Sequence, residues 1–100
     1  LGVKAETIEK LGVVSEEVAI QMATGIATAN NAEVGVGITG IAGPTGGSDK
    51  KPVGTVCFGF YINGESFAQT KHFGNIGRNK VRDASVEFVY SKLIETLNQI

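Results

Sequence analysis

The sequence predicts a small α/β domain in which helices cover a mixed β-sheet. Helical and extended patterns follow one another in the order helix, strand, glycine-rich loop, hairpin, helix. The apolar fraction of 42% suits a core of ordinary density. No internal repeat, low-complexity tail or linker divides the 100 residues, so we expect residues 1–100 to form a single domain.

The composition argues against several classes of protein. Nine Lys and Arg against ten Asp and Glu give a net charge of −1, which is unlike a general nucleic-acid binder. Cys57 is the single cysteine and His72 the single histidine, so we expect no internal disulfide and no Cys/His metal site. No apolar run approaches the roughly 18 residues of a membrane span, and no signal peptide opens the chain. We therefore expect a soluble, cytoplasmic protein.

The first elements are helical. Residues 4–11 form a short polar stretch that predicts a brief helix or turn. A longer helix is predicted after Ser15, a favourable N-cap, with Glu16 and Glu17 where the helix dipole favours acids. Its apolar stripe recurs at a spacing of four residues: Val18, Met22 and Ile26. Asn30 is a suitable terminator.

Residues 32–40 (AEVGVGITG) alternate strictly and predict a strand. We expect one face to lie in the core: Val34, Val36 and Ile38. The other face is almost bare: Gly35, Gly37 and Thr39. A helix or a ligand could therefore lie directly on the strand backbone.

A hairpin and a helix complete the chain. A second strand is predicted from Val53 to Ile62, and Asn63-Gly64 is a strong signal for a tight turn. Residues 65–73 return as the antiparallel partner, with phenylalanines on one face. A helix follows over residues 78–98, and we expect its buried stripe to be Val86, Val89, Tyr90, Leu93, Leu97 and Ile100.

Three strands leave sheet edges unpaired, which is unusual for a free-standing α/β domain. The chain also begins without methionine. We therefore expect residues upstream of Leu1 to belong to the fold and to cover the bare strand face and the open edges. The isolated chain is then expected to form a homo-oligomer or to associate with the missing N-terminal segment.

The stretch from Thr39 to Gly54, TGIAGPTGGSDKKPVG, cannot form a helix. A dinucleotide fingerprint would need its glycines to open a helix, whereas Gly35-x-Gly37-x-x-Gly40 lies inside a strand. A P-loop would need Lys50 directly after a glycine. Two interpretations remain open. The stretch is either a rigid loop that presents backbone N–H groups to a ligand, or a solvated connector.

Arg78 and Arg82 lie four residues apart and share a helix face. Both lie at the helix N-terminus, where the dipole disfavours cations. One interpretation is an anion site for phosphate or carboxylate. The other is a solvated basic face that includes Lys80. We expect His72 to be a surface residue rather than a catalytic base, and Cys57 to be a small buried hydrophobe.

Three segments carry a resemblance to a known family: GVVSEEVAIQMATG, VGVGITGIAGPTGGSDKKPVGTV and GRNKVRDAS. They resemble the CinA C-terminal domain family over essentially all 100 residues. Its single-domain bacterial members are nicotinamide-nucleotide amidases, which convert nicotinamide mononucleotide to nicotinic acid mononucleotide and ammonia. The resemblance implies a three-layer α/β/α fold, a small-molecule nucleotide substrate in pyridine nucleotide salvage, and neither a metal nor a cofactor.

The resemblance also assigns roles to residues. Thr39 matches the active-site hydroxyl of the glycine-rich stretch, and Arg78 or Arg82 matches an arginine near the substrate. The glycines that shape the pocket are Gly40, Gly43, Gly46 and Gly47.

One departure from the family separates two hypotheses. The family's nucleophilic serine lies in an Ala-Glu-Ser-Cys-Thr-Gly-Gly-type segment, and a Tyr-Ser-Asn-x-x-Lys-type segment follows it. Both precede the point where this chain begins, and neither occurs here. The chain is then either the C-terminal part of an amidase domain, inactive by itself, or a non-catalytic nucleotide-binding or interaction module.

Overall fold

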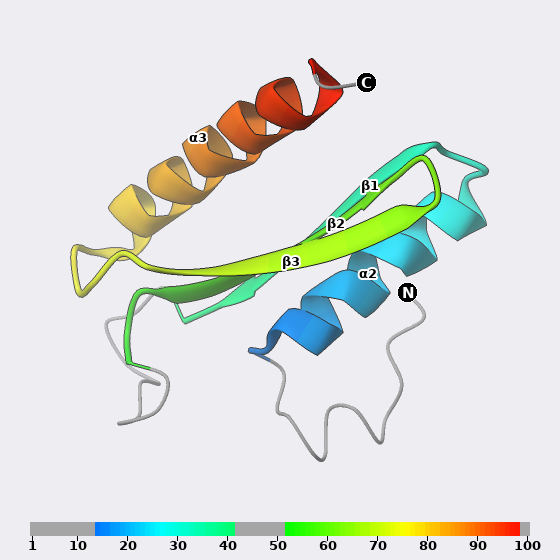
Figure 1. The fold of residues 1–100 in the computed structure, drawn as a ribbon. Helices are drawn as coiled ribbons and strands as arrows, with labels where there is room; N and C mark the ends of the chain where they lie inside the picture. Colours follow the sequence, from blue (N-terminus) through cyan, green and yellow to red (C-terminus); the bar gives the residue numbers. More distant parts are fainter. Residues whose placement is uncertain (1–13, 42–51, 99–100) are drawn as a thin grey trace.

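The computed structural model describes residues 14–41 and 52–98. The elements within them are α2 (Glu16–Ala29), β1 (Val34–Gly40), β2 (Thr55–Ile62), β3 (Glu65–His72) and α3 (Arg78–Leu97) (Figure 1). Their order matches the order predicted from the sequence. The helix or turn expected over residues 4–11 lies outside the described residues.

The strands form a sheet in the order β1-β2-β3, and both pairings are antiparallel. The parallel partner that a mixed sheet requires is therefore not among the described strands, contrary to the sequence-based expectation. The physical reason is that parallel neighbours need a crossover connection, usually a helix, and the glycine-rich stretch between β1 and β2 cannot form one. The hairpin is as predicted, since Asn63 and Gly64 both have positive φ, at 50° and 89°.

One face of the sheet is covered by α2, which begins at the predicted cap. The Ser15 hydroxyl accepts a hydrogen bond from the Val18 amide at 3.2 Å. The helix lies so close to the sheet that a Cβ added at Gly37 or Gly59 would overlap the carbonyl oxygen of Ala19. The bare strand face is thus covered by a helix of this chain, which corrects the expectation that upstream residues cover it.

Close approach also changes which side of α2 is buried. The sheet-facing positions are the small ones, Val18, Ala19, Ala23 and Ala27. Met22 and Ile26, expected in the apolar stripe, are only half-buried. Because α2 lies directly on the glycine backbone of the sheet, no space remains between them for larger side chains. The alanines therefore make the contact, and the longer apolar residues lie at its margin.

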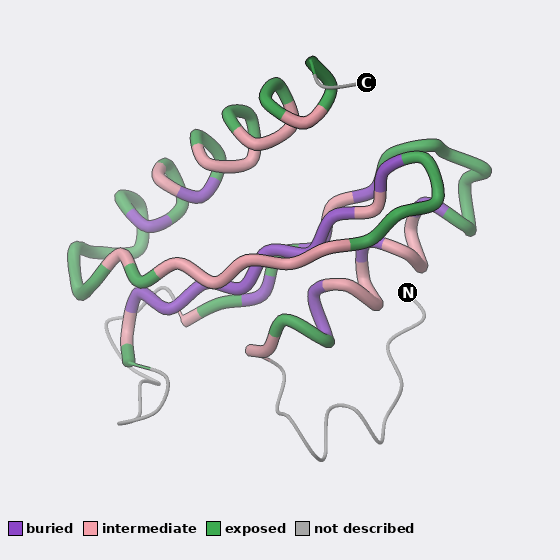
Figure 2. The backbone as a smooth tube through the Cα atoms, viewed as in Figure 1, coloured by how far each residue is buried: buried purple, intermediate pink, exposed green. Residues whose placement is uncertain are grey.

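The opposite face of the sheet carries an aromatic layer. Phe58 and Phe60 on β2 are fully buried. The Phe58 ring lies 4.6 Å from that of Phe88 on α3, and the Phe60 ring stacks on Phe67 of β3 at 4.9 Å. These rings hold α3 further from the sheet than α2 lies on the other side (Figure 1). The arrangement is a helix–sheet–helix sandwich, as the resemblance implied, with β2 as its buried centre (Figure 2).

The buried side of α3 differs from the prediction. Val81 and Ser85 are buried, and the partly buried residues packed on the core include Phe88, Val89 and Leu93. Three residues of the expected stripe are exposed instead: Val86, Tyr90 and Leu97. Apolar residues surround most of this helix, so spacing alone did not identify the sector that meets the sheet.

The valine face of β1 is also more open than expected. Val34 and Ile38 remain 38% and 40% exposed. Val36 alone of this face packs against the core cluster. β1 is an edge strand in the described sheet, so side chains along it have neighbours on one side only.

The contact between α2 and the sheet yields a testable prediction. The Gly59→Ala change should lower the free energy of unfolding by about 3 kcal/mol, because the new methyl group would overlap the α2 backbone. Gly64→Ala is the control. No atom lies within 4 Å of its added Cβ, so only its positive φ should cost stability, by about 1 kcal/mol. Equal midpoint shifts in urea unfolding would contradict the proposed helix–sheet contact.

Candidate anion-binding site

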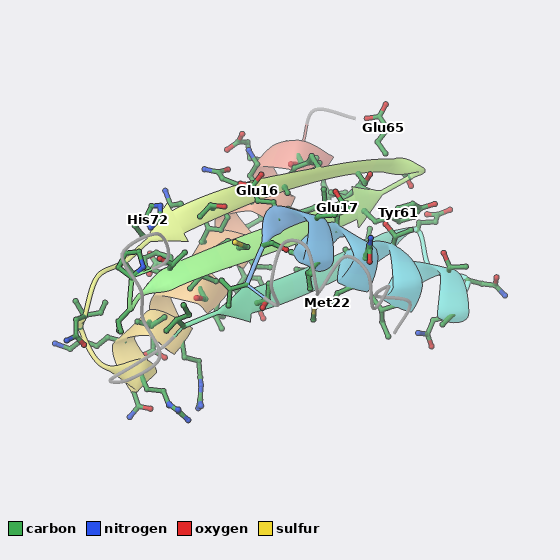
Figure 3. All side chains as sticks on the ribbon, turned by 90° about the horizontal axis from the view of Figure 1, so that it is seen from below. Glu16, Glu17, Met22, Tyr61, Glu65 and His72 are labelled. Carbon is green, nitrogen blue, oxygen red and sulfur yellow. The ribbon has the colours of Figure 1, made fainter. Side chains whose placement is uncertain are left out.

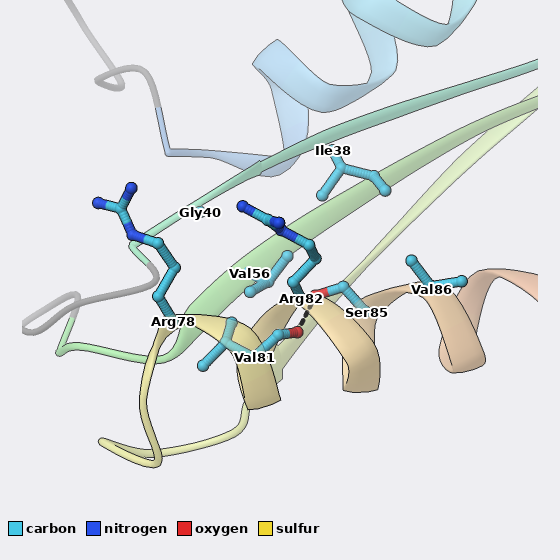
Figure 4. Close-up of a pocket in the computed structure, with 8 residues that line it drawn as sticks. All are labelled: Ile38, Gly40, Val56, Arg78, Val81, Arg82, Ser85 and Val86. Atoms are coloured by element: carbon cyan, nitrogen blue, oxygen red, sulfur yellow. Dashed lines mark hydrogen bonds between the residues drawn. The ribbon is translucent and has the colours of Figure 1, made fainter.

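A cavity of about 290 Å³ lies between the end of β1 and the first turns of α3 (Figure 4). It is on the aromatic side of the sheet. The lining residues are Ile38, Gly40, Val56, Arg78, Val81, Arg82, Ser85 and Val86. The structure therefore brings together three of the residues singled out in the sequence, Gly40 and both arginines.

The two arginines supply the positive charge of the site. Arg78 is the first residue of α3 and Arg82 lies one turn later, so both side chains reach the same cavity. Within residues 14–41 and 52–98 neither arginine has a carboxylate partner in an ion pair. Guanidinium groups without a carboxylate partner are suited to bidentate binding of phosphate or carboxylate.

The start of α3 adds to the positive electrostatic potential of the site. Its N-cap is Gly77, with φ of 96°, and no side chain caps the helix. No acidic residue lies in the first turn. The first amide N–H groups of a helix lack intrahelical acceptors and carry partial positive charge. An anion bound here would therefore meet both the guanidinium groups and the positive end of the helix dipole.

Ser85 is a site residue that the sequence analysis missed. It is buried, and its hydroxyl donates to the carbonyl oxygen of Val81 at 2.8 Å. Since its proton is engaged, the Ser85 oxygen is left as an acceptor on the cavity wall. The signal was present, because residues 78, 82 and 85 are spaced by four and three and share one helix face.

The remaining walls of the cavity are apolar. Val56 and Val81 are buried beneath it, and Ile38 and Val86 form its rim. Gly40 lets the end of β1 lie close to the Val56 side chain, since an added Cβ would lie 2.9 Å from Val56 Cγ2. The cavity thus combines a cationic end with apolar walls, which suits a ligand that has both an anionic group and an apolar group.

Thr39 lies on the other face of the sheet. Alternation along β1 places it with Gly35 and Gly37, which α2 covers, and its register partner is Cys57. Thr39 is 8% exposed. The structure therefore does not place the Thr39 side chain in the arginine cavity. The Thr39 side chain and the arginine cavity approach each other only at the end of β1, where Gly40, which lines the cavity, follows Thr39 directly.

A polar cluster lies next to Thr39 on the α2 side of the sheet, and two of its members, Glu16 and His72, are labelled in Figure 3. The Cys57 thiol contacts the Thr70 hydroxyl at 3.5 Å, and Thr70 donates to the Glu16 carboxylate at 2.6 Å. Thr55 Oγ1 lies 3.2 Å from His72 Nδ1. Cys57 is buried and His72 exposed, as predicted. This cluster is held together internally, and Thr55 is too deeply buried to meet a ligand.

Three predicted glycines, Gly43, Gly46 and Gly47, lie outside the described residues. In the described part of the chain, no group of three or more His, Cys, Asp or Glu is arranged to hold a metal ion. Neither helix in this described part of the chain is both long and apolar enough to span a membrane.

Comparison with known proteins gives a consistent picture. The family described as the CinA C-terminal domain matches residues 1–97. A CinA-like protein of Kosmotoga olearia is 51% identical over 88 residues, which cover 88% of this chain and 21% of that protein. The chain thus spans about a fifth of this curated relative.

Two solved structures share the fold. A competence/damage inducible protein from Agrobacterium tumefaciens matches with a TM-score of 0.89 and 42% identity, over 95% of this chain and 58% of that chain. A competence or damage-inducible protein from Enterobacter asburiae matches with a TM-score of 0.91 and 37% identity, over 97% of this chain and 60% of that chain.

The cavity predicts how single arginines contribute to anion binding. Arg82→Gln should weaken binding of inorganic phosphate roughly tenfold or more, because a charged hydrogen bond is lost. Lys80→Gln is the matched control. It removes one charge from the same turn of α3 without touching the cavity lining. Phosphate titrations followed by ³¹P NMR would measure both, and equal losses would mean that the region acts only as a diffuse basic face.

Proposed function

Since this chain belongs to the CinA C-terminal domain family, we propose that it forms the substrate-binding part of a nicotinamide-nucleotide amidase. The proposed reaction is hydrolysis of nicotinamide mononucleotide to nicotinic acid mononucleotide and ammonia. The observation that carries the proposal is the cavity with two arginines beside the strand end of a CinA domain.

The cavity supports this substrate class through its chemistry. A mononucleotide has one phosphate, and Arg78, Arg82 and the start of α3 offer it a cationic end. The apolar walls are suited to a flat pyridine ring. The cavity volume of about 290 Å³ is at the small end of ligand sites, so an open side is needed to admit a whole mononucleotide.

Thr39 contributes from the other face of β1. Thr39 and Gly40 are the last residues of β1, so a ligand beyond the strand end can contact both faces of the sheet. In the proposed reaction a nucleophile loses its proton to a base and attacks the carboxamide carbon, the C–N bond breaks and ammonia leaves with a proton from a general acid. Water then hydrolyses the acyl-enzyme and releases the acid. The resemblance assigns the nucleophile to a serine in a segment that does not occur in this sequence, so Thr39 is proposed as a hydrogen-bonding group.

The alternative function is a non-catalytic nucleotide-binding or interaction module. One observation favours it. The single His72 bonds to Thr55, whose side chain is buried, so this imidazole has no accessible hydroxyl to activate as a nucleophile. Such a module would use the arginine cavity to bind the nucleotide without hydrolysing it.

Ammonia release from nicotinamide mononucleotide tests the proposal. We expect the 100-residue chain alone to give no enzymatic rate, and the same chain joined to the serine-bearing segment of a CinA relative to give turnover. Nucleotide binding without hydrolysis in the joined protein would favour the alternative. Rapid turnover by the chain alone would contradict the assignment of the nucleophile to another segment.

Thr39 can be tested in the joined protein. Thr39→Val should lower kcat by roughly 100-fold while the protein stays folded, because the loss of one buried hydroxyl costs only about 1–3 kcal/mol of stability. Thr39→Ser, which retains the hydroxyl, should restore much of the rate. If both variants keep full activity, Thr39 is only a structural residue of the strand end.

A further inference from the structure

Three polar side chains form a row across the α2 face of the sheet. Thr39 of β1 pairs in register with Cys57 of β2, and Cys57 pairs with Thr70 of β3. Directly opposed residues on antiparallel neighbours have Cβ atoms about 4.5–5.5 Å apart, so each side chain lies beside the next. Thr39 and Cys57 are both buried. The row therefore connects the end of β1, beside the candidate site, to the outer strand β3.

Glu16 of α2 lies at the β3 end of this row. Its carboxylate accepts a hydrogen bond from the Thr70 hydroxyl at 2.6 Å. An ionised carboxylate can only accept, and its charge makes the bond stronger than one between neutral groups. Thr70 has a single hydroxyl proton, so that proton is committed to Glu16.

The commitment of the Thr70 proton determines the direction of the next contact. Cys57 Sγ and Thr70 Oγ1 lie 3.5 Å apart, and their positions alone would allow either atom to donate. Because Thr70 gives its proton to Glu16, the thiol is the donor and the Thr70 oxygen is the acceptor. The thiol proton of Cys57 therefore points toward β3 and away from Thr39.

The direction of the thiol proton has a consequence for Thr39. A thiol has one proton, so the sulfur presents only lone pairs to its neighbour on β1. In the reverse order, the thiol proton would turn to the Thr39 oxygen and compete there with a donor of the ligand. Thr39 lies at the end of β1, next to Gly40 of the cavity lining. A ligand group beyond this strand end therefore meets an oxygen to which the thiol does not donate.

We propose that Glu16 is a positioning residue for Thr39. It acts through the Thr70 hydroxyl and the Cys57 thiol, and it keeps the Thr39 oxygen an acceptor for an N–H group of the ligand. The inference rests on the proposed function for the identity of that group, the carboxamide of nicotinamide mononucleotide. Nicotinic acid mononucleotide has a carboxylate in the same place and no N–H to donate. The row therefore favours binding of the substrate over binding of the product.

The direction of the thiol proton can be measured without any nucleotide. Cys57 is the only cysteine of the 100-residue chain, so its infrared spectrum has a single S–H stretching band. Glu16→Ala should move this band to higher frequency, because the Thr70 oxygen becomes a weaker acceptor when its own proton loses the carboxylate. Glu17→Ala is the matched control. It removes the other glutamate of the first turn of α2, which bonds to Gln21 instead of the row, and should leave the band unchanged (Figure 3).

The effect on the ligand is measured in the protein joined to the serine-bearing segment. Glu16→Ala should lower kcat/KM for nicotinamide mononucleotide roughly tenfold, because one positioned hydrogen bond is weakened, while the inhibition constant of nicotinic acid mononucleotide stays unchanged. Thr70→Val should have the same effect. Thr70→Ser retains the hydroxyl and should restore the wild-type values. Without turnover, the dissociation constants of the two nucleotides replace these values, and Glu16→Ala should reduce the preference for the amide by the same factor.

Three results would overturn the proposal. The first is an S–H band that is the same in Glu16→Ala and in the wild type. The second is an equal effect of Glu16→Ala and Glu17→Ala on nicotinamide mononucleotide. The third is equal weakening of both nucleotides, which would indicate a structural role alone. Failure of the amidase proposal is a separate observation, since the joined wild-type protein then releases no ammonia while the band and the two dissociation constants still decide the role of Glu16.

Discussion

The backbone contact between α2 and the glycines of the sheet is the constraint on which the rest of the structure depends. Gly35, Gly37 and Gly59 allow the helix to lie directly on β1 and β2, with the backbone of Ala19 and Ala23 at closest approach. This face of the sheet then has no space for large residues. Val56, Phe58 and Phe60 of β2 point to the other face, where the phenylalanines build the aromatic layer and set the distance of α3 from the sheet. The cavity exists because α3 is held off the sheet at that distance.

Much of this fold could be predicted from local sequence. Ser15, the alternation over residues 34–40 and the Asn63-Gly64 turn each carry short-range information, and the elements lie where they indicated. The bare strand face was also recognised as a platform for a helix or a ligand. The buried sides of the helices were harder to predict. Met22 and Tyr90 are apolar residues at suitable spacing, yet the distance between layers, which no local pattern encodes, decides whether they are buried.

The site was predictable to a smaller extent. Two arginines one turn apart at a helix start are a local signal, and both line the cavity. Ser85 shares their face but was missed, because serine within a helix is commonly a neutral residue. Thr39 and Arg82 were assigned to one site through resemblance alone. The β1 backbone separates Thr39 from Arg82, because strand alternation turns Thr39 to one face and α3 holds Arg82 on the other. The position of α3 depends on packing between residues far apart in the sequence.

The first turn of α3 gives up stability in a way that has a practical consequence. Acidic residues are favoured at such a position, and α3 instead begins with Gly77 and Arg78. Directed evolution for heat resistance alone would tend to replace Arg78 with an acid, whereas Gly77 would be kept because its positive φ of 96° disfavours any side chain. The improved protein would unfold at a higher temperature but would lose one of the two arginines that line the cavity. Thermostable variants of this fold should therefore be selected with ligand binding as a second requirement.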